Sequence, residues 1–127
     1  MRHAYLVLSL CIIAFGLIHI AATPRYSPHL TGGAVWFASG GLAIILAGAL
    51  NLLRRAYGEI ASGLRLVCVI ANVVMTTFSL LAGYATNGTI VQFAVVLGLW
   101  GGVTVFSLLP GAQSGSKRPP SSLSRNL

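Results

Sequence analysis

Four long apolar segments constrain this sequence more than any other feature. They span residues 4–22, 31–53, 60–84 and 89–109, and none contains an acidic residue. A helix of about 20 apolar residues crosses the hydrocarbon core of a bilayer, and each segment is close to that length. Charged residues make up only 7% of the chain, too few to keep so apolar a chain soluble as a monomer. The sequence therefore predicts an all-α fold, a transmembrane four-helix bundle.

Short polar segments separate these four runs and complete the predicted domain, residues 1–110. The segment from Thr23 to His29 contains two prolines and is predicted not to continue a helix. Residues 54–59 form a polar connection, and Asn87-Gly88 is a tight-turn dipeptide. The first run is longer than the apolar part of a signal peptide, so we expect it to be retained. Residues 111–127 are rich in serine, proline and glycine, which predicts a disordered tail.

Basic residues predict the orientation in the membrane. Four spans place the N-terminus, the second connection and the tail on one side, and that side holds Arg2, Arg54, Arg55, Arg65, Lys117, Arg118 and Arg125. The other side holds Arg25 alone. Because basic residues accumulate on the cytoplasmic side, both termini and the tail are predicted to be cytoplasmic, with the protein in the cell inner membrane. The basic residues flank apolar runs, so membrane lipids rather than nucleic acid are the expected partners of this +7 chain.

Small and polar residues at helical spacing predict the faces through which the helices pack. Lipid tails are as apolar as leucine, so helices in a bilayer associate through close packing and polar contacts. The predicted packing residues are Gly33, Gly40, Gly41, Gly48, Asn72, Thr76, Gly98 and Gly102. Whether these faces join helices of one chain, two copies in a homo-oligomer, or subunits of a larger membrane complex is left open by the pattern.

Polar and aromatic residues gather in the outer third of the predicted bundle and in the loop above it. The candidate ligand-binding residues are His19, Arg25, Tyr26, His29, Trp36, Ser79 and Gln92. One interpretation is a small polar pocket open to the outer side. The other is that these groups hydrogen-bond to one another and hold the helices together, a common role of polar residues in membranes.

Residues with catalytic or metal-binding chemistry are scarce. Glu59 is the single acidic residue, whereas general acid–base catalysis usually needs a carboxylate or histidine pair. Ser79 and His19 resemble a nucleophile and a base, but no third group orients the histidine. His29 is the sole candidate partner for His19 as a metal ligand. We therefore predict no catalytic residue, no metal site and no cofactor.

A resemblance to known proteins rests on the start of the second run. TGGAVWFASGGLA from Thr31 and GALNLL from Gly48, preceded by His19 and Thr23-Pro24, resemble small bacterial inner-membrane proteins with four spans. No activity is established for that group, so the resemblance implies a fold and a location but no role. The small-residue faces and the scarcity of catalytic groups favour a non-enzymatic accessory or scaffolding subunit. The alternative is a small transporter, or a membrane protein that binds lipid or a small solute in the outer pocket.

Overall fold

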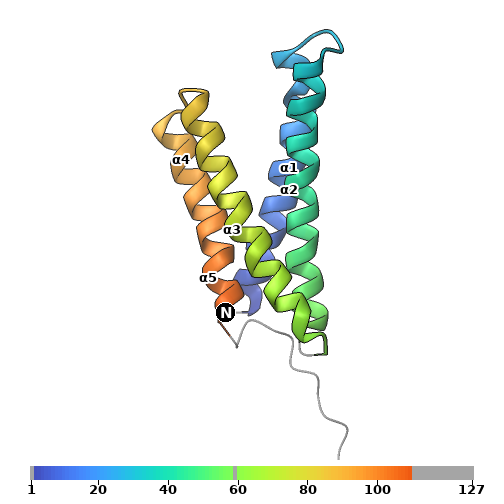
Figure 1. Ribbon diagram of the computed structural model, residues 1–127, viewed down its shortest axis with the longest axis vertical. Coiled ribbons are helices and arrows are strands. Elements are labelled where there is room, and N and C mark those ends of the chain that lie inside the picture. Colours follow the sequence, from blue (N-terminus) through green and yellow to red (C-terminus); the bar gives the residue numbers. More distant parts are fainter. Residues whose placement is uncertain (1, 59, 110–127) are drawn as a thin grey trace, which may run out of the picture.

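The computed structural model describes residues 2–58 and 60–109 as four helical spans (Figure 1). The spans are α1 (Arg2–Tyr26), α2 (Gly32–Tyr57), α3 (Ser62–Ala85) and a fourth composed of α4 (Ile90–Val96), η1 (Leu97–Gly101) and α5 (Gly102–Leu108). All four are long and apolar enough to cross a membrane, and no strand occurs in the described residues. The predicted all-α transmembrane bundle is confirmed, while the tail at 111–127 lies outside the described residues.

The first helix continues beyond its predicted end. Pro24 lies inside α1, in its last turn, and the backbone N–H of Ser27 donates to the Thr23 carbonyl at 3.0 Å. A proline lacks the N–H that would bond to the preceding turn, but so close to the helix end few further bonds depend on it. The prediction that this segment could not continue the helix was therefore wrong for residues 23–26.

The second helix also extends further than predicted. Thr31 caps its start, because the Thr31 hydroxyl accepts a hydrogen bond from the Ala34 N–H at 3.2 Å. Its last turn contains Arg54 and Arg55, which the sequence predicted to lie in the connection to the third helix. That placement of the two arginines was wrong, and Arg54 is fully buried in the bundle.

The turn between α3 and α4 has the geometry that its sequence predicts. Asn87 has a φ of 52°, in the left-handed region that asparagine and glycine tolerate best. The N–H of Gly88 donates to the Gly83 carbonyl at 2.7 Å, which closes the end of α3 in a Schellman-type arrangement. Thr89 then caps α4 by accepting from the Gln92 N–H at 3.3 Å.

A π-helical turn interrupts the fourth span. The sequence predicted one continuous helix over 89–109, but η1 separates α4 from α5. Within this turn Trp100 is only 1% exposed and is the largest fully buried side chain of the described residues. A π-turn adds a residue to one helical turn and so changes which side chains face inward.

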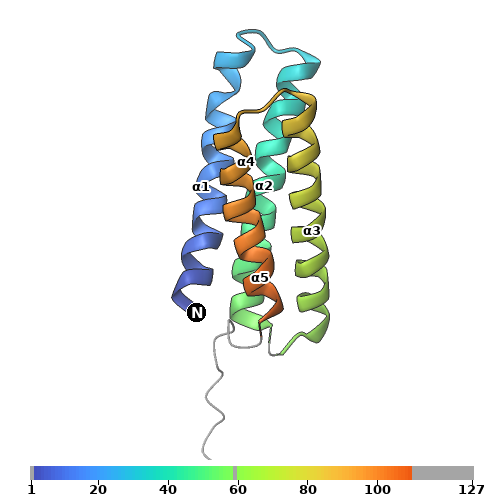
Figure 2. The same ribbon diagram turned by 90° about the vertical axis from the view of Figure 1, so that its left-hand side faces the viewer.

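The helices α1 and α2 approach each other closely because glycines form their contact. A Cβ atom on Gly41 would lie 2.6 Å from Ile20 Cγ1 and 2.9 Å from the Gly16 carbonyl oxygen. One on Gly48 would lie 2.6 Å from Ile13 Cγ1. These helices therefore form one tight hairpin, and they run side by side along their length in Figure 2.

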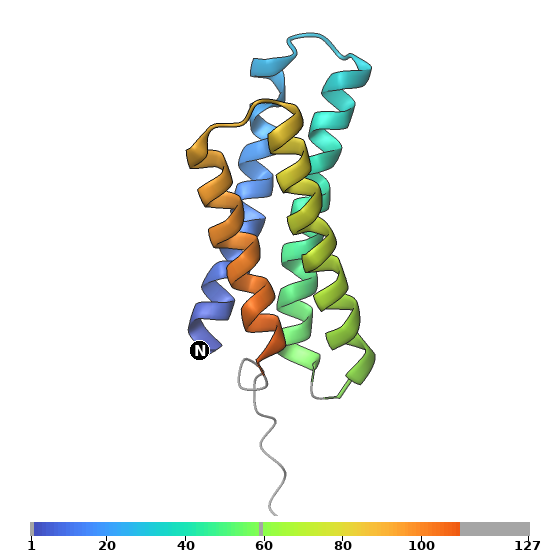
Figure 3. The same ribbon diagram turned by 60° about the vertical axis from the view of Figure 1, so that its left-hand side comes forward.

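The two hairpins meet at one end of the molecule and diverge at the other. In Figure 1 they lie close together at the end that carries the N-terminus, and a gap widens between them toward the α1–α2 loop. Figure 3 shows the hairpin of α3, α4 and α5 in front of the hairpin of α1 and α2. We call the end with the start of α1, the end of α2 and the end of α5 the closed end, and the opposite end the open end. The buried apolar core between the hairpins consists of Tyr5, Ile12, Ile44, Ala47, Val96, Trp100 and Val103.

Candidate functional site

A cavity of about 550 Å³ lies at the open end, where the hairpins diverge. It is lined by Thr23, Tyr26, Ser27, Thr31, Gly33, Ala34, Phe37, Thr86 and Gln92. Seven of these nine belong to α1, α2 and their loop, while Thr86 and Gln92 come from the ends of α3 and α4. Hydroxyl and amide groups thus share this cavity with small apolar residues.

Two of the predicted site residues line this cavity directly, and a third packs against its wall. Tyr26 and Gln92 are lining residues. The His19 ring stacks on the Phe37 ring, with 3.9 Å between centroids and an interplanar angle of 16°. Because Phe37 itself lines the cavity, His19 supports the wall from behind rather than contacting the space.

The other predicted site residues do not join this group. Arg25 and His29 are exposed at the end of α1 and in the loop. Trp36 is 75% exposed and faces away from the bundle, while Ser79 is half-buried on α3. None of these four lines the cavity at the open end. The sequence placed Trp36 and Ser79 in the outer third of the bundle and Arg25 and His29 in the loop above it, but depth does not decide which way a side chain faces.

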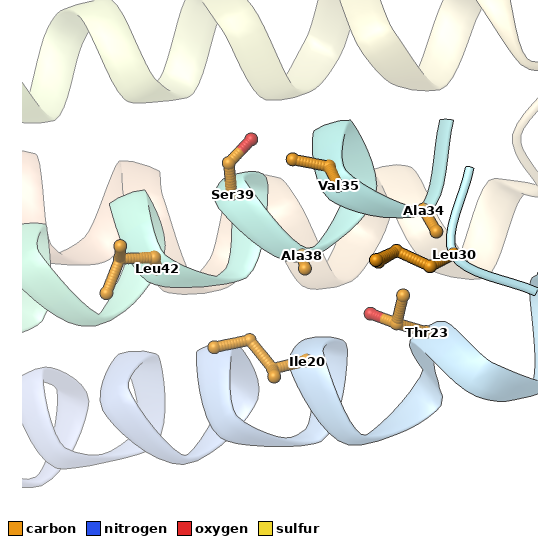
Figure 4. A pocket seen from close by; sticks show the side chains of 8 residues that line it. All are labelled: Ile20, Thr23, Leu30, Ala34, Val35, Ala38, Ser39 and Leu42. Atoms are coloured by element: carbon orange, nitrogen blue, oxygen red, sulfur yellow. The ribbon is translucent and has the colours of Figure 1, made fainter. Parts of the chain in front are cut away.

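A second, more apolar cavity of about 410 Å³ lies along the α1–α2 hairpin, and Figure 4 shows its lining residues. They are Ile20, Thr23, Leu30, Ala34, Val35, Ala38, Ser39 and Leu42. Thr23 and Ala34 line both cavities, so the two spaces adjoin at these residues. The mostly apolar lining suits a hydrocarbon chain rather than a polar solute.

A buried polar network at the closed end was not predicted as a site. The Tyr5 hydroxyl donates to Asn51 Oδ1 at 2.6 Å, and the Asn51 amide donates to Asn72 Oδ1 at 2.8 Å. The Asn72 amide and the Cys68 thiol also donate to Asn51 Oδ1, at 3.0 and 3.1 Å. All four side chains are fully buried. The network links α1, α2 and α3, and so fastens one hairpin to the other.

Arg54 extends this network with a charge. Its side chain is fully buried, and its Nη1 donates to the Tyr5 hydroxyl at 3.2 Å. Its Cζ lies 5.6 Å from the centroid of the Tyr5 ring. Its Nε and Nη2 have no hydrogen-bond partner in the described part of the chain. A guanidinium buried away from water is costly unless its donors are satisfied.

Sequence spacing contained a signal for this network. Ala47, Asn51 and Arg54 follow one another at spacings of four and three, which places them on one face of α2. Tyr5 and Ser9 share a face of α1 in the same way, and Cys68 and Asn72 share one of α3. The signal was missed for Arg54 because an arginine beside an apolar run is usually an interfacial anchor.

The predicted packing residues occupy several different environments. Gly41 and Gly48 lie in the tight α1–α2 contact, and Gly102 lies against Leu8 of α1. Asn72 belongs to the buried network, and the Thr76 hydroxyl donates to the Asn72 carbonyl of its own helix at 2.7 Å. Gly40 is near the His19 ring, and Gly33 faces the cavity at the open end. No side chain of the described residues would meet a Cβ on Gly98 within 4 Å.

Comparison with known protein families, curated proteins and solved structures finds no match for this chain. The resemblance to small bacterial inner-membrane proteins therefore stays a prediction. Within residues 2–58 and 60–109, no three His, Cys, Asp or Glu side chains lie together as a metal site would require. Two features of the geometry bear on the function of the protein. They are the divergence of the hairpins and the buried network that joins them.

Proposed function

We propose that this integral membrane protein is a non-enzymatic accessory or scaffolding subunit, which receives a transmembrane helix of a partner membrane protein between its two hairpins. The observation that carries this proposal is the cavity at the open end, which residues of both hairpins line. The hairpins are joined at the closed end by the core and the polar network. At the open end their facing surfaces are left for another occupant.

The lining of the cavity can contact the end of a partner helix closely. Gly33 and Ala34 offer little side-chain bulk, and small residues let two helix backbones approach closely in a bilayer. Thr31, Thr86 and Gln92 stand at the ends of helices, where they can hydrogen-bond the exposed backbone groups of a helix terminus. The tight glycines Gly41 and Gly48 already pack against α1, so they are not available to a partner.

The charge distribution orients this arrangement in the proposal. Arg54, Arg55 and Arg65 lie at the closed end, which the positive-inside bias places in the cytoplasm together with both termini. The cavity then opens toward the outer surface of the inner membrane. A partner helix would enter laterally, from the lipid, because all four spans are long and apolar enough to lie in the membrane.

Two adjacent glycines allow a test of the occupant. Gly33 lines the cavity. A Cβ atom on Gly33 would lie 3.8 Å from Thr31 Oγ1 and, apart from its chain neighbours and the backbone of its own helix, more than 4 Å from the other described residues. We therefore expect Gly33→Phe to fill the cavity without disturbing the fold. Gly32 has no described neighbour within 4 Å of such a Cβ and does not line the cavity. We expect Gly33→Phe to lose a partner subunit that co-purifies in mild detergent and Gly32→Phe to retain it, with equal thermal stability.

The second candidate function is a small transporter or a lipid-binding protein, and the apolar cavity along the α1–α2 hairpin favours it. This cavity adjoins the first at Thr23 and Ala34, so an acyl chain in one would lie beside a polar group in the other. Liposomes that contain only this chain separate the two proposals. A solute or lipid flux that Gly33→Phe blocks and Gly32→Phe leaves intact would refute the accessory-subunit proposal.

A further inference from the structure

Arg54 carries a positive charge inside the bundle, and the described residues include no acidic side chain to balance it. The side chain is fully buried, whereas an arginine one turn from a helix end can usually extend its charged head to the membrane surface. Its own helix end contributes partly negative carbonyl groups, which lower the cost of the charge. None of those carbonyls accepts from Nε or Nη2. The guanidinium therefore lies inside the bundle, and two of its three nitrogens form no hydrogen bond with the described residues.

The groups packed against Arg54 do not balance its charge. The Tyr5 hydroxyl, the only group to accept from Arg54 among the described residues, itself donates to Asn51. Asn51 Oδ1 already accepts from Tyr5, Cys68 and Asn72. The side chains of this network are hydroxyl, thiol and amide groups rather than carboxylates. Glu59 is the single acidic residue of the chain, and it lies outside the described residues.

The two unbonded nitrogens belong to one edge of the guanidinium. Nε–H and one N–H of Nη2 point in parallel from that edge, and such a pair matches two oxygens of a carboxylate or a phosphate group. The third nitrogen, Nη1, is held by Tyr5 at 3.2 Å. Tyr5 thus orients the guanidinium through its opposite edge and leaves the two-donor edge for a ligand.

The position of Arg54 points to a phosphate group as that ligand. Arg54 lies in the last turn of α2, close to the level of the lipid head groups in a helix that spans the bilayer. The adjacent Arg55 has a buried Nε that also lacks a partner in the described part of the chain. Basic groups gathered at this depth attract anionic lipids.

We propose that the Nε and Nη2 edge of Arg54 binds a phosphate-class oxyanion, either in a lipid head group or free in solution, at the closed end of the bundle. That edge is buried, so binding requires the atoms that cover it to move aside. The end of α2 is one turn away, so the oxyanion would reach the edge from the level of the head groups while Tyr5 keeps its bond to Nη1. Bound phosphate would supply the negative charge that the buried network lacks and would tighten the junction between the hairpins.

Thermal unfolding of the full chain in a neutral detergent tests this proposal. Inorganic phosphate is compared with chloride at equal ionic strength, and phosphatidylglycerol with diacylglycerol, which has the same chains without the phosphate. We expect phosphatidylglycerol, inorganic phosphate or both to raise the Tm by several degrees, since a ligand that binds only the folded state stabilises it. A response to phosphatidylglycerol alone assigns the lipid head group, and a response to inorganic phosphate assigns a free anion as sufficient.

Variants connect the response to Arg54. Arg54→Gln should abolish the rise in Tm, and Arg54→Lys, which keeps the charge but not the two-donor edge, should weaken apparent affinity about tenfold. Arg65→Gln is the matched control, because Arg65 lies at the same end but is exposed and donates to the Leu108 carbonyl. If Arg54→Gln does not fold, the proposal is tested by comparing the rise in Tm of Arg54→Lys with that of Arg65→Gln. Any of three results would overturn the proposal. The first is no rise in Tm in the unmutated protein, the second is an equal rise in all variants, and the third is a rise that appears only in Glu59→Gln.

Discussion

Gly41→Ala should loosen the α1–α2 hairpin, and the structure allows the cost to be worked out. The added Cβ would lie 2.6 Å from Ile20 Cγ1, 2.9 Å from the Gly16 carbonyl oxygen and 3.1 Å from the Ile20 nitrogen. The Ile20 side chain can rotate away, but the two backbone atoms cannot, so the helices must separate. Overpacking of this kind costs about 1–3 kcal/mol, and the better helix propensity of alanine offsets up to about 1 kcal/mol. We expect a net loss of about 0–2 kcal/mol.

Gly98→Ala is the matched control for this experiment. Gly98 also lies within a transmembrane span, but no described residue would meet its new Cβ within 4 Å, so the substitution should be neutral or stabilising by up to about 1 kcal/mol. The free energy of unfolding of both variants can be measured by titration from a mild detergent into a denaturing one. If Gly41→Ala is as stable as Gly98→Ala, the close contact between α1 and α2 does not exist as described.

Three further predictions follow from burial, hydrogen bonding and charge. Trp100→Ala should destabilise the protein by about 3–5 kcal/mol because Trp100 is 1% exposed in the core, whereas Trp36→Ala, at a position 75% exposed, should change stability by less than about 0.5 kcal/mol in the same titration. Asn72→Ala should cost about 1–3 kcal/mol because it removes both hydrogen bonds between Asn72 and the buried Asn51, whose amide keeps only the Ala47 carbonyl as an acceptor. Thr76→Val, which removes only a bond to the carbonyl of its own helix, should be nearly neutral, and equal losses in these two variants would contradict the interhelical role of the network. Reporter fusions after Gly58 and after Leu127 should read cytoplasmic and one after Leu30 external, and an external reading after Leu127 would refute the orientation or the number of spans.

The candidate site shows how far depth along a helix can be read from the sequence. His19, Trp36, Ser79 and Gln92 were grouped because they lie in the outer third of their helices. Depth depends only on the rise per residue, but the direction of a side chain depends on how each helix is rotated in the bundle. Trp36 consequently faces outward and Gln92 faces the cavity. The cavity itself comes from the divergence of the hairpins, which no local pattern records.

At the closed end the spacing pattern was present in the sequence, but the prediction for Arg54 followed the charge bias instead. The faces of α1 and α3 that carry Tyr5, Ser9, Cys68 and Asn72 are legible from their spacing, and all four side chains are buried. Arg54 shares the Asn51 face of α2, yet charge bias alone assigns it to the membrane surface. Whether an arginine anchors at the surface or enters the bundle depends on what the neighbouring helices offer it. Here that is the Tyr5 hydroxyl, 49 positions away in the chain.

Two properties can be read from the linear sequence, namely the four helices that are long and apolar enough to cross a membrane and the dipeptide that turns the chain after α3. These properties add up over about 20 consecutive residues or lie within a single turn, so neighbours in the chain suffice to decide them. The burial of Trp100 at the π-turn, the divergence of the hairpins at one end and the position of Arg54 inside the bundle are visible only in the folded molecule. Each of these features depends on contacts between helices. There, a small change in packing distance or one donor without an acceptor changes the free energy more than the conformational preference of a single segment does.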